Sequence, residues 1–485
     1  MLYSLKHSSF DLLIIGGGVT GAGIALDAAS RGLKTALIEK KDFASGTSSK
    51  STKLVHGGLR YLKNFEFGLV RKFGKERAIL NKNAPHLAYP RSMLLPFYKK
   101  WGLSSWATPL GIFAYELLAG VKKSEKFQFF RGLSVLKKEP LLKPFATGGC
   151  LYTEYQTNDS RLVIELIKTS LLYNSTCLNY IEANSFFLKK GKVSGVFVSD
   201  VVSGSSFKIK ARSVINATGP WVDSFLEKTK SNSKKKLFLT KGVHIVFKKK
   251  DLPIKTPVYF PVQDGRMVFA IPRLNLIYVG TTDTPFNKKQ DEVFVEKSDV
   301  KYIISSIKKV FSVPHLKEKH VVSSWAGIRP LIFMAGKKPS DISRKDELFL
   351  SKNNLITVAG GKLSGYRMMA EKATDLVFKK LCLPFVKSKT KNITLIGGGF
   401  KSSSFFNNIK KQVFNMGGRS IDAEYLFYTY GSQSEQILDS VKKDGVFSVE
   451  IERAEKVFTK KYEAVVFEND YKKRRTQKAF FPLLD

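Results

Sequence analysis

The chain has 485 residues, of which 43% are hydrophobic and 25% charged, and it carries a net charge of +40. This length supplies cores for two or three domains, and the composition excludes a disordered chain and predicts a globular protein. The three cysteines have no metal or redox spacing and the six histidines include no HxxxH pair, so no metal site is predicted. Such cysteine usage is typical of a reducing compartment, and the nine residues before the first predicted strand are too few for a signal peptide, so we expect a cytoplasmic protein.

The positive charge has two interpretations. A basic surface attracts anionic lipid or nucleic acid, at about 1 kcal/mol per lysine beside an anionic membrane. Here the lysines occur throughout the chain rather than in one block, which favours compositional drift for most of the excess. Because no basic segment interleaved with aromatic residues is present, we expect no nucleic-acid partner. The rest of the charge is free to serve a membrane surface.

A dinucleotide-binding pattern opens the chain. An apolar predicted strand leads into Gly16, Gly18 and Gly21 and then into a helix of small residues. In this pattern the first glycine allows a tight turn, the second lets a diphosphate approach the backbone, and the third lets the helix pack on the strand. The diphosphate then lies at the positive end of the helix dipole. Glu39 ends the next predicted strand, where it is placed to accept hydrogen bonds from an adenosine ribose.

Two later apolar strands also end in glycine. One leads into Ala217 and Gly219, and the other leads into Gly360 and Gly361. The fingerprint alone does not separate NAD from FAD, but three such strands predict one discontinuous domain around one large cofactor. The position of the fingerprint at the start of a long chain also favours a flavoprotein.

Residues 101–121 form an apolar segment that is about long enough to span a bilayer. Pro109 and Glu116 argue against a lipid-exposed spanning helix. Lysines on both flanks and tryptophans at one end favour an interfacial helix, and a buried core helix is an equal alternative.

Later parts of the chain alternate between helical and strand patterns. The sequence predicts a helix over 160–172, a strand over 266–271 and a charged helix over 450–466. Residues 396–399 resemble a second nucleotide loop, but Ser402 stands at the position of the third glycine, so we interpret this stretch as a linker turn.

Short polar strings, several of them after glycines, predict loops that line a cleft. Three arginines and a lysine among them would favour a small dianionic substrate, because arginine binds phosphate oxygens in a bidentate manner. The sequence alone does not show that they converge. The strings are HGGLRY (56–61), KGVH (241–244), TTD (281–283), AGIRP (326–330), SR (343–344) and GGKLSGYR (360–367).

Together with the run TSSKSTKLVH (47–56) and the string NATGPWV (216–222), these motifs resemble the aerobic-type, FAD-dependent glycerol-3-phosphate dehydrogenase family. They occur in the order of the family, over roughly residues 8 to 375, and residues 428–435 and 474–476 resemble its helical C-terminal domain. The resemblance implies an enzyme that oxidises sn-glycerol 3-phosphate to dihydroxyacetone phosphate and transfers a hydride to N5 of FAD.

The resemblance also implies roles for individual residues. Arg329 and Arg344 would hold the phosphate, and Tyr61 would line the substrate site. Arg60 and Lys362 would polarise the C2 oxygen of the substrate as charge develops on it.

A base must take the proton of the substrate hydroxyl. His244 is the first candidate, because the unperturbed pKa of histidine lies near neutrality. His56 is the second candidate, although its place before two glycines favours contact with the flavin. The residues expected to bind FAD are Gly16, Gly18, Gly21, Glu39, Thr47, Ser48, Ser49, His56, Ala217, Gly219, Gly361, Lys362, Leu363 and Ser364.

Two motifs depart from the family pattern. Ser364 and Gly365 stand where the family has two threonines, so one hydroxyl is kept and one side chain is lost. Asn158 and Asp159 stand where the family has two acidic residues. Neither change removes a residue that we assign to chemistry, so we expect activity to survive.

The elements and the resemblance predict an α/β fold of the D-amino-acid-oxidase type. We expect a discontinuous Rossmann-like FAD-binding domain over 1–90, 151–236 and 340–390. A β-rich domain on the substrate and membrane side would comprise 91–150 and 237–339, followed by a helical C-terminal domain over 391–485.

The electron acceptor is left open by the sequence. A membrane quinone is the first expectation, with the protein peripheral at the inner face of the cell membrane. The alternative is an oxidase that reduces oxygen to hydrogen peroxide. The oligomeric state also stays open, with a homodimer as one alternative.

Overall fold

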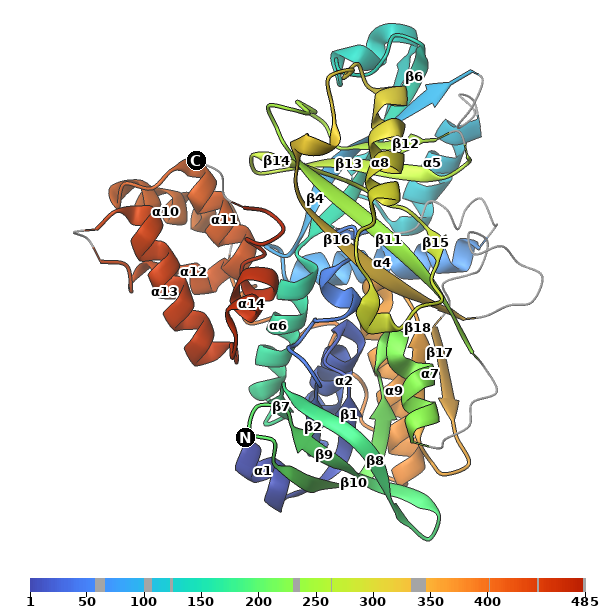
Figure 1. The fold of residues 1–485 in the computed structure, drawn as a ribbon, viewed down its shortest axis with the longest axis vertical. Coiled ribbons are helices and arrows are strands. Elements are labelled where there is room, and N and C mark those ends of the chain that lie inside the picture. The colour runs from blue at the N-terminus through green and yellow to red at the C-terminus, as the bar shows by residue number, and fades with distance from the viewer. Residues whose placement is uncertain are drawn as a thin grey trace.

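The structure is a computed structural model. Two sheets follow one another along the long axis of the molecule, and the C-terminal helices lie at one side (Figure 1). The structure describes residues 1–56, 66–99, 107–122, 125–229, 236–262, 264–332, 346–400, 402–442 and 445–482.

The first sheet joins strands from three distant parts of the chain. Its strands are β1 (Ser9–Ile15), β2 (Thr35–Ile38), β7 (Thr176–Leu178), β8 (Ile181–Lys189), β9 (Lys192–Asp200), β10 (Ser206–Asn216), β17 (Asp346–Leu350) and β18 (Ile356–Gly360). The order is β17-β18-β10-β1-β2-β7, with β9 paired to β10 and β8 to β9. Ile15 lies opposite Asn216, and Asn216 opposite Thr357, in parallel pairs. The glycines that follow β1 and β10 and those that end β18 therefore meet at the carboxyl edge of the sheet.

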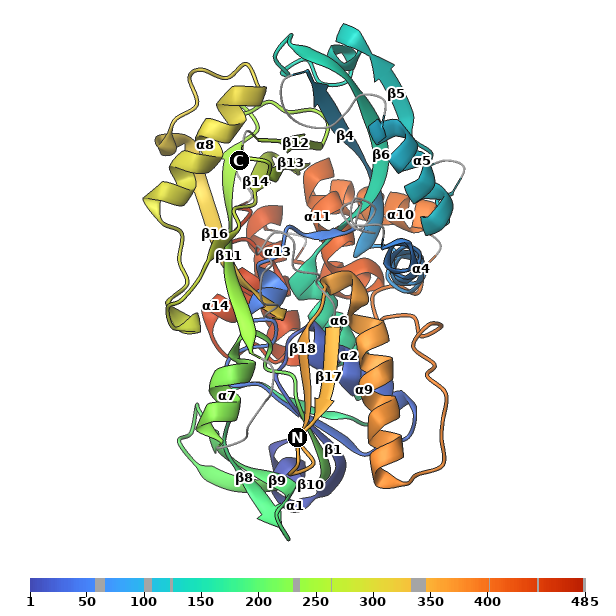
Figure 2. The same ribbon diagram turned by 90° about the vertical axis from the view of Figure 1, so that its right-hand side faces the viewer.

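Alternate side chains of β1 face two different layers, as the strand period of two requires. Leu12 and Ile14 belong to the core beneath the helices, whereas Leu13 and Ile15 belong to the core beneath β8 and β9. Figure 2 shows α7 and α9 on opposite sides of this sheet. The helices around it are α1 (Leu2–His7), α2 (Val19–Ser30), α6 (Asp159–Leu171), α7 (Val222–Lys228) and α9 (Tyr366–Leu381).

The second sheet joins two segments of the chain that the first sheet separates. Its strands are β3 (Leu54–Val55), β4 (Ala88–Tyr98), β5 (Gln128–Arg131), β6 (Ala146–Thr157), β11 (Leu237–Lys248), β12 (Val258–Pro261), β13 (Met267–Arg273), β14 (Leu276–Gly280), β15 (Thr284–Pro285) and β16 (Val321–Ile332). The order is β15-β11-β14-β13-β12-β4-β6-β3, with β16 paired to β11 and β5 to β6. The helices that accompany it are α4 (Phe67–Asn83), α5 (Ala107–Ala119) and α8 (Lys297–Val310).

The C-terminal helices have a hydrophobic core of their own. The predicted helix over 450–466 lies in α13 but ends at Tyr462, because Glu463 leaves the helix and Ala464 has a positive φ of 52°. The helices are α10 (Ser402–Asn415), α11 (Ser420–Tyr430), α12 (Ser434–Leu438), α13 (Phe447–Tyr462) and α14 (Glu468–Asp470), followed by a π-helical turn over Tyr471–Arg475.

Buried ion pairs join the C-terminal helices to the first sheet and to α6. Arg161 and Lys168 of α6 donate to the carboxylate of Glu463, at 2.6 and 2.9 Å. Arg475 donates to both carboxylate oxygens of Asp42, at 2.7 and 2.9 Å. Each of these buried charges is paired with an opposite charge, as buried charges require.

Residues 396–399 form a turn between α9 and α10, as the linker interpretation predicts. The N–H of Gly397 donates to a carboxylate oxygen of Glu165 in α6, at 2.7 Å. A Cβ at Gly397 would lie 2.6 Å from Nε2 of His86, so the turn packs tightly where it is anchored.

Candidate active site

Glycines are required where β1, α2 and β10 approach one another. Gly16 has a φ of 114°, and a Cβ there would lie 2.4 Å from the carbonyl oxygen of Ala217. A Cβ at Gly21 would lie 1.9 Å from the carbonyl oxygen of Gly16. Because neither position has room for a side chain, the start of α2 lies directly beside the ends of both strands. Gly18 is the N-cap of α2, where free N–H groups and the helix dipole favour an anion.

The carboxylate of Glu39 lies beside this turn. Its Oε2 accepts a hydrogen bond from the N–H of Gly17 at 2.7 Å, and its Oε1 accepts one from the N–H of Lys41 at 2.9 Å. Burial raises the pKa of the carboxyl, although both N–H groups act in the opposite direction. Each oxygen keeps a second lone pair, which a ribose hydroxyl can use.

The run 47–55 connects the two sheets. It begins with a short 3-10 helix (Thr47–Ser49) and ends in β3 of the second sheet. Ser48 Oγ accepts a hydrogen bond from the N–H of Val19 in the first turn of α2, at 2.9 Å. Thr47 Oγ1 donates to the carbonyl oxygen of Ile328 in β16, at 2.6 Å. The run therefore places hydroxyl groups between the dinucleotide turn and the second sheet.

Asp159 anchors the centre of this run. Its carboxylate accepts hydrogen bonds from the N–H and the hydroxyl of Ser51, at 3.0 and 2.7 Å, and from Nζ of Lys53 at 2.7 Å. The side chains of Lys53 and Asp159 are both fully buried. The preceding residue, Asn158, caps α6 by accepting from the N–H of Arg161.

His244 and Arg329 lie on one face of the second sheet. In the pairing of β11 with β16, Trp325 lies opposite His244 and Arg329 lies opposite Thr240. Thr240 and His244 are an even number of residues apart, so their side chains and those of their partners share a face. That face is turned toward the run 47–55, because Nε2 of His244 lies 3.1 Å from Oγ1 of Thr52.

Arg329 is held by the residues that follow β14. Its guanidinium donates to Oγ1 of Thr281 at 2.7 Å, to the carbonyl oxygen of Thr282 at 3.1 Å and to the carboxylate of Asp283 at 2.9 Å. A Cβ at Gly242 would lie 2.5 Å from this guanidinium, so the glycine of the KGVH string provides the space for it. The strings KGVH, TTD and AGIRP therefore form one unit.

The imidazole of His244 is buried and neutral. Burial lowers its pKa well below 6.5, and the charges of Arg329 and Lys53 act in the same direction. The ring stacks on Trp325, with 4.9 Å between ring centroids and 13° between planes. A neutral imidazole is the protonation state that can accept a proton.

Lys362 follows β18, which contacts β16, and it is the N-cap of the short 3-10 helix Leu363–Gly365. Its Nζ lies 5.4 Å from the centroid of the Phe73 ring. A Cβ at Gly365 would lie 2.9 Å from the same ring. Phe73 of α4 therefore fills the space that a side chain at position 365 would need.

Comparison with known proteins identifies the family to which this chain belongs. A family model described as FAD dependent oxidoreductase matches residues 11–370. The aerobic glycerol-3-phosphate dehydrogenase of Bacillus subtilis (strain 168) is 45% identical over 100% of this chain and 90% of its own length. That of Staphylococcus aureus (strain USA300) is 43% identical over 99% of this chain and 89% of its own. The chain belongs to the FAD-dependent glycerol-3-phosphate dehydrogenase family.

Solved structures agree with this assignment. The glycerol-3-phosphate dehydrogenase from Bacillus halodurans complexed with FAD matches with a TM-score of 0.82 and 36% identity, over 99% of this chain and 88% of that chain. The L-alpha-glycerophosphate oxidase from Mycoplasma pneumoniae with FAD bound matches with a TM-score of 0.61 over 79% of this chain and 97% of that chain. Its 17% identity shows the fold alone. The predicted family, the D-amino-acid-oxidase-like fold and the FAD cofactor are confirmed, while the domain limits stay a prediction.

FAD fits the described residues of this family member. Glu39 offers its carboxylate to the ribose, and the N-terminus of α2 at Gly18 offers its N–H groups to the diphosphate. Thr47, Ser48 and Ser49 continue from this turn toward His244. On the other side, Gly219 and Gly361 have φ values of 59° and 91° and follow the neighbouring strands β10 and β18. We therefore keep the assigned FAD residues as a proposal.

Three of the assigned residues, Arg60, Tyr61 and Arg344, lie outside the described residues. The structure brings Arg329 and His244 to one sheet face beside the run 47–55, and His56 directly follows β3 at the end of that run. Lys362 reaches the region from the first sheet.

Sequence reasoning missed Trp325, Thr52 and Lys53. Trp325 had a signal, because it precedes Arg329 by four residues, a spacing that in a strand places both side chains on one face. Thr52 and Lys53 lie in the run 47–56, but no role was assigned to them, since their contacts with His244 and Asp159 join distant parts of the chain.

Proposed function

We propose that this protein oxidises sn-glycerol 3-phosphate to dihydroxyacetone phosphate with FAD, and that a membrane quinone receives the electrons. The relatives at 45% and 43% identity are named aerobic glycerol-3-phosphate dehydrogenase, a name that corresponds to the oxidation of the substrate. The observation that carries the proposal is the shared face of β11 and β16, which presents a fixed guanidinium and a neutral imidazole beside the hydroxyl-rich run 47–55. That pair suits a substrate with one phosphate and one hydroxyl to be oxidised.

The phosphate is proposed to bind Arg329, together with Arg344. The guanidinium of Arg329 is already oriented by Thr281 and Asp283, so little side-chain entropy is lost when an anion binds. Asp283 also neutralises part of its charge, so a second arginine would strengthen the binding of a dianion.

His244 is proposed to take the proton of the C2 hydroxyl. Its neutral state makes it available at ordinary pH, but the imidazolium formed would lie near the charges of Arg329 and Lys53. The bound phosphate offsets those charges and so favours the proton transfer. Arg60 and Lys362 are proposed to stabilise the C2 oxygen, and Tyr61 to line the substrate site. Bound FAD supplies the hydride acceptor.

The membrane part of the proposal rests on α5. Leu110, Phe113 and Leu117 expose 64%, 58% and 76% of their surface, at the helical spacing of three and four residues. Ile112 and Tyr115 on the other face are fully buried. The interfacial interpretation of the segment therefore fits the outer face of the helix, and the core interpretation fits its inner face. No helix in the described part of the chain is long and apolar enough to cross a membrane, so we propose a peripheral contact at the inner face of the cell membrane.

Anaerobic titration of the FAD-loaded protein with sn-glycerol 3-phosphate tests the reaction. We expect the flavin absorbance at about 450 nm to decrease, because the cofactor receives the hydride. In the His244→Asn variant, FAD should stay bound and the rate of bleaching should fall roughly 10²-fold to 10⁴-fold. A folded, FAD-loaded protein whose flavin stays oxidised would overturn the substrate, and an unchanged rate in the variant would overturn the base.

The acceptor needs a separate measurement. The enzyme reduced in this way is mixed either with a quinone or with oxygen, and the rate at which the flavin absorbance returns is followed. Faster reoxidation by the quinone supports the dehydrogenase. Faster reoxidation by oxygen, with hydrogen peroxide as product, would establish the oxidase alternative instead.

A further inference from the structure

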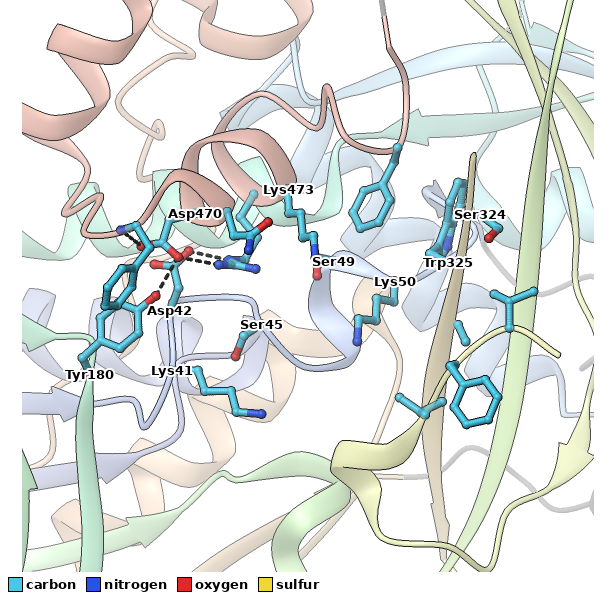
Figure 3. A pocket seen from close by; sticks show the side chains of 18 residues that line it. Lys41, Asp42, Ser45, Ser49, Lys50, Tyr180, Ser324, Trp325, Asp470 and Lys473 are labelled. Carbon is cyan, nitrogen blue, oxygen red and sulfur yellow. Dashed lines mark hydrogen bonds and ion pairs between the residues drawn. The ribbon is translucent and has the colours of Figure 1, made fainter. Parts of the chain in front are cut away.

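A cavity of about 620 Å³ lies between the C-terminal helices and the two sheets. We call it the interdomain cavity. The segment after β2, the end of the 3-10 helix at Ser49, strand β16 and the segment 467–474 all contribute side chains to it (Figure 3). Of the described residues assigned above to cofactor or substrate, Ser49 alone lines it. The cavity is thus a neighbour of the active site and not part of it.

The two carboxylates of the cavity are already committed. Asp42 accepts hydrogen bonds from Nε of Arg474 at 2.5 Å and from the guanidinium of Arg475 at 2.7 and 2.9 Å. Asp470 accepts from Arg474 at 2.5 Å and from the hydroxyl of Tyr180 at 2.6 Å. Neither has a charge left to neutralise another cation.

The lysines of the cavity are not matched by these carboxylates. Lys41 pairs with Asp291 at 2.6 Å, outside the lining. Lys50 and Lys473 also line the cavity, and neither makes an ion pair with the described part of the chain. In Figure 3 the side chains of Lys41, Lys50 and Lys473 lie around one open space. The cavity therefore carries an uncompensated positive charge.

The surroundings of Lys50 show that the positive charges of the cavity lie close to one another. Its side chain is partly buried, and its Cβ approaches β16 closely, because a Cβ at Gly327 would lie 2.8 Å from it. Burial lowers the pKa of its ammonium group, and the charges of Lys41, Lys473 and Arg474 lower it further, while Asp291 acts in the opposite direction without reversing the shift. An anion between these groups would relieve the repulsion.

Aromatic side chains complete the lining. Phe294 and Phe467 expose 57% and 51% of their surface, whereas Trp325 and Phe480 are almost fully buried. Exposed aromatic rings next to uncompensated cations fit a ligand that has a flat apolar part and an anionic part. The volume lies within the range of roughly 300 to 1,000 Å³ that small-molecule sites occupy.

We propose that the interdomain cavity binds a small phosphate ester with a flat apolar body, as a site separate from that of the substrate. Lys50 and Lys473 would hold the phosphate, and the aromatic residues at the rim would contact the body. Such a ligand would join the C-terminal helices to the run that begins at Thr47. It would also touch Trp325, whose ring stacks on His244, so it is placed to influence the active site.

Titration calorimetry of the FAD-loaded protein tests this site independently of turnover. ADP serves as the probe with a flat body, and inorganic phosphate as the probe without one. We expect ADP to bind more tightly than phosphate, with an affinity that falls as salt is added. In Lys473→Met and in Lys50→Met, the affinity for ADP should fall about tenfold, because a charge-assisted contact is lost.

Lys472→Met is the matched control. Lys472 precedes Lys473 in the same turn, but it pairs with Glu468 at 3.3 Å and does not line the cavity, so its affinity for ADP should equal that of the unmodified protein. The proposal is overturned if the holoenzyme binds no ADP, if both lysine variants bind it as well as the control, or if ADP releases FAD. Because no glycerol 3-phosphate is present, failure here and failure of the proposed reaction are distinguishable.

Discussion

His244 owes its position to three neighbours of different chemistry. Trp325 stacks on one face of the imidazole, and Oγ1 of Thr52 lies 3.1 Å from Nε2. Gly280 makes room for the ring, since a Cβ there would lie 2.3 Å from its Cδ2. Trp325 is itself fixed, because its Nε1 donates to the carbonyl oxygen of Ser51 at 3.2 Å. The orientation of the proposed base thus depends on residues to which the motifs assigned no role.

Replacing Trp325 should therefore change the pH dependence of flavin reduction. The folded-state pKa of His244 lies well below 6.5, so the neutral base is present at neutral pH and is lost only as the pH falls through that low value. In Trp325→Leu, water reaches the imidazole and its pKa rises toward the ordinary 6.5. The acid limb of the rate should move to higher pH, and the maximal rate should fall up to roughly 10²-fold through misplacement of the ring.

The measurement is the anaerobic rate of flavin reduction between pH 5.5 and pH 8, a range chosen around the ordinary pKa of histidine of about 6.5. Trp325→Phe keeps an aromatic face and serves as the control, with an acid limb close to that of the unmodified enzyme. The phosphate of the substrate titrates equally in all three proteins. Superimposable pH profiles in the Leu and Phe variants would show that Trp325 does not set the pKa of the base.

Helix α5 has two faces of different character. Its inner face is structural: the hydroxyl of Tyr115 donates to Glu154 at 3.2 Å and accepts from Arg77 at 3.2 Å. Its outer face exposes Leu110, Phe113 and Leu117. Exposed apolar stripes of this kind are typical of membrane or partner contacts.

Phe113→Glu should weaken binding to vesicles that contain anionic lipid. The change removes an apolar side chain from the interface and places a negative charge against a negative surface, so the partition coefficient should fall roughly tenfold to 10²-fold. Flavin reduction in solution should not change. Phe414→Glu on α10, which lies on the other side of the molecule in Figure 1, exposes a similar 49% and is the control for cosedimentation. Equal loss in both variants would argue against α5 as the contact.

Elements with a local pattern could be predicted from the sequence. Gly21 is dictated by a backbone contact inside one turn, with the carbonyl oxygen of Gly16, so the fingerprint located the start of α2. The predicted helix over 160–172 corresponds to α6, which is Asp159–Leu171. The end of α13 was predicted four residues too late, because the interactions of Glu463 with Arg161 and Lys168 are not visible in the helical periodicity.

At the scale of the whole molecule, long-range charge pairs were the part that local patterns could not predict. Arg475 belongs to a motif recognised in the sequence, yet its partner Asp42 is far away in the chain and lies in no recognised motif. The same holds for Asp159, which appeared as one half of a family pair and proves to anchor the run that contains several of the proposed cofactor residues. Local motifs identified single residues, whereas the contacts between residues far apart in the chain became visible only in the fold.

The packing of the C-terminal helices against α6 should therefore become less stable as the pH falls. Burial alone would raise the pKa of the Glu463 carboxyl, but Arg161 and Lys168 outweigh burial and lower it to about 2. A carboxyl whose folded pKa is depressed stabilises the fold above its unfolded pKa of about 4.3, and this stability is lost as the pH falls toward the folded value. The difference corresponds to about 3 kcal/mol, which should disappear between about pH 5 and pH 2.

Glu463→Gln isolates this contribution. The variant should be less stable at neutral pH by about 3 to 5 kcal/mol, because Arg161 and Lys168 lose the carboxylate they share inside the protein. Its stability should then decline less steeply than that of the unmodified protein as the pH falls from 5 to 2, a window set by the unfolded and folded pKa values. Denaturant unfolding at several pH values, followed by hydrogen exchange of α13, measures both effects. Glu468→Gln is the control, since its exposed pairs with Lys456 and Lys472 should contribute less than about 1 kcal/mol. Parallel acid slopes for the unmodified protein and Glu463→Gln would mean that another group, with Asp42 as the first candidate, governs the docking.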